Sequence, residues 1–204
     1  MPLKIVRKDH VDIPGSGYVL LTTAHVAHPE RDLYTGQIVE EAALLSKCFA
    51  VIGKASREFV NPNRVQFAQS ELRESIQTFL KEEGVRCILD IRGRKDPGVV
   101  LRTVRSDSAS RLTIDLVKTR LARDFKISVV EDDKVLDPES IITKYSKKDQ
   151  QGNFTVEAFQ IEFGLEEKSL KRNKVIEVIA EIVGLINQEL GFSESDQGGS
   201  DALD

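Results

Sequence analysis

The chain has 204 residues, of which 40% are hydrophobic and 30% are charged, so it is long enough for one well-buried domain and short for two. It contains no apolar run of about eighteen residues and begins without the apolar core of a signal peptide, so we expect a cytoplasmic protein with no membrane span. The formal net charge of -4 argues against nucleic acid as a partner.

Short apolar runs rich in β-branched residues predict the buried strands. These runs cover Tyr18–Ala24, Phe49–Gly53, Val85–Ile91, Ile127–Val130 and Val156–Phe163. Helical periodicity and capping residues predict the helices. The predicted helices cover Gly36–Phe49, Ser70–Glu83, Ser108–Phe125 and Ser169–Leu190. Strands and helices that alternate in this way indicate an α/β fold with a mostly parallel or mixed central sheet and helices on both faces.

The last predicted helix carries an apolar stripe and is followed by a polar end of the chain. Residues 193–204 are acidic and glycine-rich, so we expect a single domain over residues 1–192 and a disordered acidic tail after it. The cysteines, Cys48 at the end of a predicted helix and Cys87 in a predicted strand, are expected to be reduced core residues and not a disulfide.

The segment from Arg92 to Lys126 is locally basic, with ten Lys and Arg residues against four Asp. Two interpretations stay open. The segment could be a solvated helix face followed by a flexible loop, or it could form a positive rim that attracts a small acidic substrate. RNA is a weaker third interpretation because no aromatic residues alternate with the charges.

The predicted first buried strand runs directly into His25-Val-Ala-His-Pro-Glu30, which places two of the three histidines and a carboxylate at one strand end. Histidine and carboxylate side chains are ligands of zinc. Because ligands of parallel sheets collect beyond the carboxyl ends of the strands, we expect His25, Arg57, Arg92 and Glu162, which follow or close four different strands, to share one edge. The third histidine, His10, lies in a polar N-terminal segment and is expected to be an ordinary surface residue.

A second informative segment is Ser56-Arg-Glu-Phe-Val-Asn-Pro-Asn-Arg64. Together with Leu89-Asp-Ile-Arg-Gly93, Gln160-Ile-Glu162 and the terminal helix, these motifs occur in an order that resembles the N-formylglutamate amidohydrolase family and its zinc carboxypeptidase-like relatives, including the phage poly-γ-glutamate hydrolases. The resemblance covers about residues 15–190. It implies a hydrolase with an α/β fold, a zinc ion and a small acidic substrate.

The resemblance also implies roles for individual residues. His25 and Glu30 match metal ligands, and Glu162 matches the glutamate that works as acid and base. Arg57 and Arg64 match a clamp for the substrate carboxylates, and Asn63 supports that loop or binds the substrate. In chemical terms, a metal-bound water would attack the amide carbonyl while Glu162 takes up its proton.

Arg92 departs from the family pattern, because it occupies the position of a histidine that binds the metal. A guanidinium group has no lone pair to donate, so Arg92 cannot be a ligand. His28 could replace the missing imidazole. A catalytic zinc ion usually needs three protein ligands, so the departure bears directly on whether a metal is bound.

Purely structural roles are alternatives for these residues. His25 could hydrogen-bond a loop carbonyl, and Glu162 could belong to a solvent face. Arg57 and Arg64 could pair with Asp90 or Glu162 in an internal ion network, and Asp90 could orient a neighbour or pair with Arg92.

Three functional hypotheses follow. The first is a metal-dependent amidohydrolase that cleaves an N-formyl, N-acyl or γ-glutamyl amide. The second is a catalytically silent relative that binds an anionic ligand or a protein partner. The third is a metal-free enzyme in which Arg92 stabilises an oxyanion and Glu162 activates water.

Overall fold

The computed structural model describes residues 4–23, 33–54, 71–103, 109–131 and 141–192. Its strands form one nine-stranded sheet. The strands are β1 (Ile5–Val6), β2 (His10–Ile13), β3 (Val19–Thr23), β4 (Phe49–Gly53), β5 (Cys87–Arg94), β6 (Val99–Thr103), β7 (Ile127–Glu131), β8 (Lys147–Lys148) and β9 (Phe154–Gly164).

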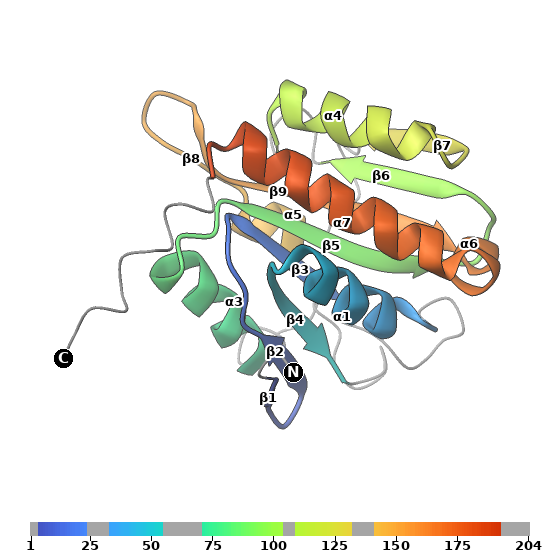
Figure 1. The fold of residues 1–204 in the computed structure, drawn as a ribbon. Helices are drawn as coiled ribbons and strands as arrows, with labels where there is room; N and C mark the ends of the chain where they lie inside the picture. Colours follow the sequence, from blue (N-terminus) through green and yellow to red (C-terminus); the bar gives the residue numbers. More distant parts are fainter. Residues whose placement is uncertain (1–3, 24–32, 55–70, 104–108, 132–140, 193–204) are drawn as a thin grey trace.

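The sheet is mixed, with a parallel centre. Its strand order is β1-β2-β4-β3-β5-β9-β6-β7, and β8 pairs with β9 off this path. Strands β4, β3, β5 and β9 run parallel to one another, whereas β2 is antiparallel to β4 and β6 is antiparallel to β9. The carboxyl ends of the four central strands therefore lie at one edge, beside the amino end of β6 (Figure 1).

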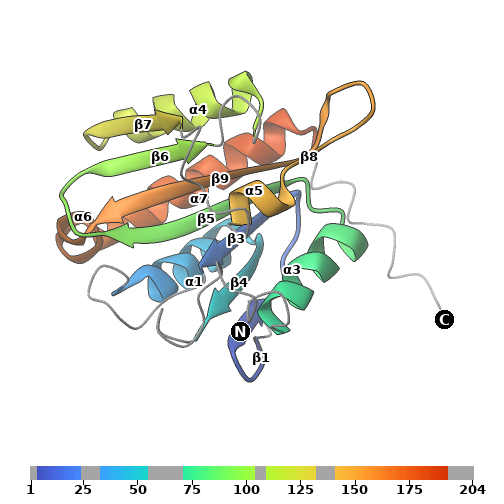
Figure 2. The same cartoon turned by 180° about the vertical axis from the view of Figure 1, so that it is seen from behind.

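Helices cover both faces of the sheet (Figures 1 and 2). The helices are α1 (Thr35–Ser46), α3 (Glu71–Glu82), α4 (Arg111–Ala122), α5 (Ile141–Tyr145), α6 (Leu165–Leu170) and α7 (Arg172–Glu189). On one face α1, α4 and α7 bury the larger apolar cluster, and on the other face α3 and α5 bury a smaller one. Helix α6 follows directly after the carboxyl end of β9.

The predicted fold class is confirmed, and each of the predicted strands is present: β4 has the predicted bounds, and the other four differ at one or both ends. The predicted terminal helix over 169–190 is present as α7, which begins later than predicted, at Arg172, because the non-helical backbone of Lys171 separates it from α6. The predicted helix over 36–49 ends at Ser46, so Cys48 lies between α1 and β4. Cys48 and Cys87 are free and buried, as predicted.

The described part of the basic segment is more than a solvated helix face. It contains the end of β5, all of β6 and helix α4. Ser110 caps α4, because its hydroxyl accepts a hydrogen bond from the Thr113 amide at 3.2 Å. Arg120 in α4 is only 5% exposed and pairs with Asp124 at 2.6 Å and with Glu181 of α7. Part of the positive charge therefore joins two helices.

None of the described helices combines the length and the apolar character that a membrane crossing needs.

Candidate functional site

Polar side chains occupy the carboxyl half of one sheet face. On the amino half of this face, Leu20, Ile88 and Ala158 pack in the apolar cluster beneath α3 and α5. Successive residues of a strand point to opposite faces, so the residues two and four positions further along these strands lie on the same face. Together with the antiparallel neighbour from β6, they form the polar row, which comprises Thr22, Asp90, Arg92, Gln160, Glu162 and Arg102.

The register of the sheet explains why these residues meet. Asp90 lies beside Gln160 and Arg92 lies beside Glu162, because β5 and β9 are parallel and pair over these positions. Strand β6 brings Arg102 beside Gln160 from the other side. Residues separated by about sixty positions in the sequence thus become direct neighbours.

Asp90 and Arg92 form the buried end of the row. Asp90 is fully buried, and its carboxylate accepts hydrogen bonds from Arg92 Nε at 2.6 Å and from the Thr22 hydroxyl at 3.2 Å. Burial raises the pKa of Asp90, although the charge of Arg92 and the two hydrogen bonds oppose this rise. The predicted pairing of Asp90 with Arg92 is confirmed.

The Arg92 guanidinium is not fully used by this pair. Its side chain is 13% exposed, and in the described part of the chain the buried Nη2 has no hydrogen-bond acceptor. A buried donor without an acceptor costs free energy, so this atom favours an additional anionic or carbonyl ligand. Because Arg92 lies beside Glu162 in the register, that ligand would lie close to a carboxylate.

Glu162 is held from two sides. Its Oε1 accepts hydrogen bonds from Arg102 Nε at 2.9 Å and from Gln160 Nε2 at 2.5 Å. The side chain is 16% exposed. The two hydrogen bonds to Oε1 fix the orientation of the carboxylate, and its partial exposure lets it exchange a proton with a bound water.

Arg102 and Gln160 are site residues that the sequence prediction missed. Gln160 belongs to a motif but has no role assigned from the sequence, and Arg102 is only counted among the basic residues of its segment. The signal that could have found Arg102 is the apolar run Val99-Val-Leu101 before it, which is typical of a short buried strand.

The remaining predicted site residues lie outside the described residues. They are the metal ligands His25, His28 and Glu30 and the substrate-binding residues Arg57, Asn63 and Arg64. The strands that precede them do end at the expected edge, because Thr23 of β3 pairs with Ile52 of the parallel strand β4. Whether these six side chains share a cleft with Glu162 remains a prediction.

The described part of the site does not fit zinc by itself. Arg92 offers only protonated nitrogens, and the neighbouring Asp90 is already bound by Arg92 and Thr22. The predicted zinc ligands His25, His28 and Glu30 therefore stay a prediction.

The prediction that His10 is a surface residue is wrong. His10 lies in β2 and is fully buried, with Asp9 on one ring nitrogen and Ser75 and Asp12 on the other. Burial alone lowers the pKa of His10, but the hydrogen bonds and charges of Asp12 and Asp9 outweigh burial and raise it. The polar neighbours in the sequence belong to this buried network and do not indicate exposure.

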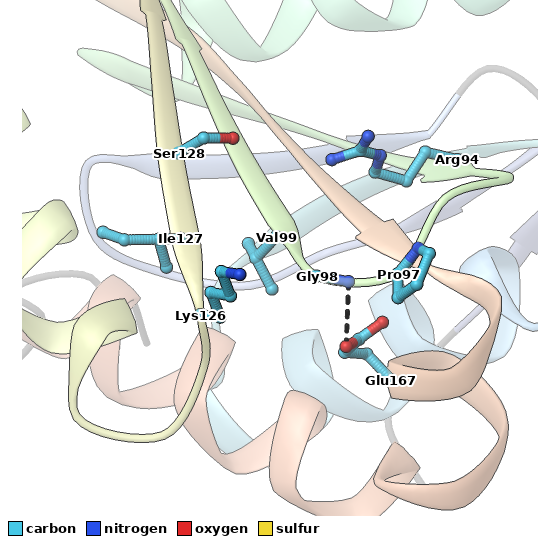
Figure 3. Close-up of a pocket in the computed structure, with 8 residues that line it drawn as sticks. All are labelled: Arg94, Pro97, Gly98, Val99, Lys126, Ile127, Ser128 and Glu167. Atoms are coloured by element: carbon cyan, nitrogen blue, oxygen red, sulfur yellow. Dashed lines mark hydrogen bonds between the residues drawn. The ribbon is translucent and has the colours of Figure 1, made fainter.

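A pocket of about 330 Å³ lies near the polar row, where β5 ends and β6 and β7 begin (Figure 3). Within it Glu167 of α6 accepts a hydrogen bond from the Gly98 amide at 3.0 Å, which joins α6 to the turn before β6. Arg94 and Lys126 also line the pocket. No predicted site residue is among the residues that line it.

The fold and the position of the polar row place this chain among α/β proteins whose side chains converge at the carboxyl edge of a mixed sheet. Models of protein families and curated protein sequences give no match to the chain. Solved structures do give matches, and they share this architecture.

The N-formylglutamate amidohydrolase from Ralstonia eutropha JMP134 matches 89% of this chain and 97% of its own, at 10% identity and a TM-score of 0.59. A bacteriophage poly-gamma-glutamate hydrolase matches 91% of each chain, at 12% identity and a TM-score of 0.53. A metallo-carboxypeptidase from Pseudomonas aeruginosa has 11% identity and a TM-score of 0.53, and the match covers 89% of this chain and 60% of the carboxypeptidase. At these identities the similarity establishes the fold.

Proposed function

We propose that this chain hydrolyses an amide bond in a small acidic substrate, with Glu162 as the general base. The observation that carries the proposal is that Glu162 and Arg92 lie side by side on neighbouring strands. One carboxylate oxygen of Glu162 is held by Arg102 and Gln160, and the buried Nη2 of Arg92 has no acceptor among the described residues. The shared fold of amidohydrolases and peptidases supports this chemistry.

In this proposal Glu162 takes a proton from the attacking water and passes it to the departing nitrogen. Arg92 Nη2 donates a hydrogen bond to the carbonyl oxygen of the substrate, where negative charge develops. Arg57 and Arg64 hold the substrate carboxylates by charge-assisted hydrogen bonds, and Asn63 supports their loop.

The proposed hydrolysis also involves a bound metal ion. His25, His28 and Glu30 would hold a zinc ion, which when bound polarises the amide carbonyl and acidifies the attacking water. Arg92 is permanently charged and would stand near that ion, so we propose weaker zinc binding than in a site with three imidazole or carboxylate ligands and no nearby cation.

The test is hydrolysis of N-formyl-, N-acetyl- and γ-glutamyl-linked glutamate by the wild type and by Glu162→Gln. We expect the variant to lose at least about a hundredfold in kcat, the scale of a lost general base. Glu166→Gln is the matched control, because Glu166 is an exposed glutamate only four positions away on α6. Equal rates for the wild type and Glu162→Gln would exclude Glu162 as the base.

The metal requirement is tested separately. Wild-type protein is dialysed against a chelator and then titrated with Zn²⁺, and His25→Gln is treated in the same way. Activity that returns with zinc in the wild type and not in the variant would support the metal-dependent route. Full activity without metal would favour the route in which Arg92 alone stabilises the oxyanion. The absence of hydrolysis under all conditions would favour a silent relative that binds an anionic ligand.

A further inference from the structure

A second group of metal-binding side chains lies outside the polar row. Asp9, His10 and Glu71 each offer one ligand atom, and these atoms all lie within 4.8 Å of one another. His10 is fully buried, the Asp9 side chain is 22% exposed, and Glu71 is exposed at the start of α3. The group therefore combines a rigid imidazole with two carboxylates that reach it from different elements.

The environment of His10 defines which ring nitrogen can bind a metal. Nε2 lies 2.8 Å from the Ser75 hydroxyl, and that hydroxyl donates to Asp12 Oδ2 at 3.0 Å. Because the Ser75 proton points to Asp12, the hydroxyl oxygen accepts from His10, so Nε2 carries a proton. Asp12 Oδ1, 3.1 Å from Nε2, adds a negative charge on the same side.

The other ring nitrogen, Nδ1, faces negatively charged carboxylate groups. Nδ1 lies 2.5 Å from Asp9 Oδ1. At this distance the contact is a hydrogen bond with the proton on Nδ1, and a metal ion bound to Nδ1 would take the place of that proton. Glu71 adds a second carboxylate to this side.

We propose that Asp9, His10 and Glu71 bind a divalent metal ion of the zinc class, with His10 coordinating through Nδ1. The arrangement has the outer contacts that metal-bound histidines generally have, because the nitrogen that does not bind the metal donates towards Ser75 and the buried Asp12. Asp12 is only 3% exposed, so this support is rigid.

The donor set selects the metal. An imidazole nitrogen disfavours Ca²⁺ and Mg²⁺, which prefer oxygen ligands alone. One nitrogen and two carboxylates suit Zn²⁺ and similar first-row ions, and the exposed side of Glu71 leaves room for a water ligand.

The position of the site suggests a structural role. The backbone carbonyl of Asp9 accepts a hydrogen bond from the Lys54 amide at 2.8 Å, directly after β4. Glu71 is the first residue of α3. A metal bound here would tie the start of α3 to β2 and to the end of β4. This site does not depend on the proposed hydrolysis.

The experiment isolates this site from the predicted zinc ligands. A His25→Gln/His28→Gln background is titrated with Zn²⁺ by calorimetry and with Co²⁺ by visible absorption. We expect one ion per chain. Adding Glu71→Gln or Asp9→Asn should weaken binding at least about tenfold, a scale already typical of changes outside the ligands themselves. Glu74→Gln is the matched control, since Glu74 is exposed on the same helix.

Nitrogen NMR of the His10 ring provides a second measurement. On addition of Zn²⁺ the Nδ1 resonance should move while Nε2 keeps its proton. No ion bound in the background variant would overturn the proposal. Binding that Glu71→Gln and Asp9→Asn leave unchanged would overturn it as well. If Glu71→Gln fails to fold, Asp9→Asn and the NMR measurement still decide the outcome.

Discussion

At the scale of single residues, two nitrogens of the Arg92 guanidinium have different surroundings. Its Nε neutralises the buried Asp90 at 2.6 Å, and its Nη2 has no acceptor in the described part of the chain. The first contact stabilises the fold, and the second is available for a ligand. A histidine at this position could bind a metal but could not make the same contact with Asp90 through a permanent charge.

We predict that Arg92→Leu destabilises the protein by about 3–5 kcal/mol at neutral pH, because it leaves a buried carboxylate without its cation. Burial raises the pKa of Asp90 even with Arg92 present, and the loss of Arg92 raises that pKa further. The folded variant then keeps a proton that the unfolded chain has released. Its stability should therefore fall as the pH rises from the ordinary aspartate range through the raised pKa.

Denaturant titrations at pH 4 and pH 7 test this prediction. Arg92→Leu combined with Asp90→Asn should recover most of the lost stability. Arg94→Leu is the control on the same strand, because Arg94 pairs with Asp96, whose side chain is 78% exposed, and such pairs contribute less than about 1 kcal/mol. A cost that is the same at both pH values would argue against an ionised Asp90 in the folded wild type.

The cysteines give a second prediction at this scale. Burial raises the pKa of Cys48 to about 12, although a hydrogen bond with Ser46 opposes this, and burial also raises the pKa of Cys87. Thiol reagents react with the thiolate, so the native protein should resist labelling at pH 8. After unfolding in guanidinium, both thiols should react. Rapid labelling of the native protein would show that one of them is accessible.

At the scale of secondary structure, the sequence predicts elements that local pattern determines and misses those that depend on pairing. The apolar runs of β3, β4, β5, β7 and β9 identify these strands, because both faces of the sheet are covered. Strand β6 escapes prediction, since its apolar run is only three residues long, Val99-Val-Leu101, and lies between basic residues. Strand β2 escapes because its buried polar residues, His10 and Asp12, satisfy one another in a way that only the fold creates.

The same limit applies to the candidate site. Arg92 and Glu162 could be predicted because each lies at the end of an apolar run, although β5 and β9 continue two residues beyond them. Arg102 could not, because its contact with Glu162 depends on the antiparallel register of β6 and β9. No local pattern specifies which residue lies opposite another across about sixty positions.

A charged residue in the buried apolar stripe of α7 should strongly destabilise the protein. Ile179 is fully buried with Val175, Ile182 and Ile186, as the sequence predicted. Ile179→Glu should destabilise the protein by about 3 kcal/mol or more, because it buries an unpaired carboxylate. Leu185→Glu on the exposed side of the same helix should change stability by less than about 1 kcal/mol. Thermal unfolding measures both, and equal effects would contradict the packing of α7.

A substitution at a glycine in the same helix should increase the stability of the protein. Gly184 lies inside α7, and a Cβ added there would meet no atom within 4 Å. Gly184→Ala should therefore stabilise the protein by about 0.5–1 kcal/mol. Gly15→Ala is the contrast, because its Cβ would lie 2.2 Å from the Cys48 carbonyl carbon, and main chain cannot yield easily. Destabilisation by both substitutions would show that Gly184 is packed.

At the scale of the molecule, one sheet lies between the two apolar clusters and contributes residues to both. Leu21 and Leu89 face the larger cluster, whereas Leu20 and Ile88 on the same strands face the smaller one. Neither cluster can lose its packing without exposing the strands that support the other. The polar row lies on the same strands, so the site and the two clusters depend on the same hydrogen-bonded ladder.

This shared sheet predicts one cooperative unfolding transition. Far-UV circular dichroism and tyrosine fluorescence should give the same midpoint in guanidinium, because the strands that support one apolar cluster also support the other. Removal of residues 193–204 should leave that midpoint unchanged, whereas removal of Phe192 as well should lower it. Phe192 packs edge-on against Tyr18 with 5.4 Å between ring centroids, and such a pair contributes about 0.5–1.5 kcal/mol beyond its buried area. Two separated transitions would mean that the clusters unfold independently, and a lower midpoint after the first truncation would assign the tail a place in the fold.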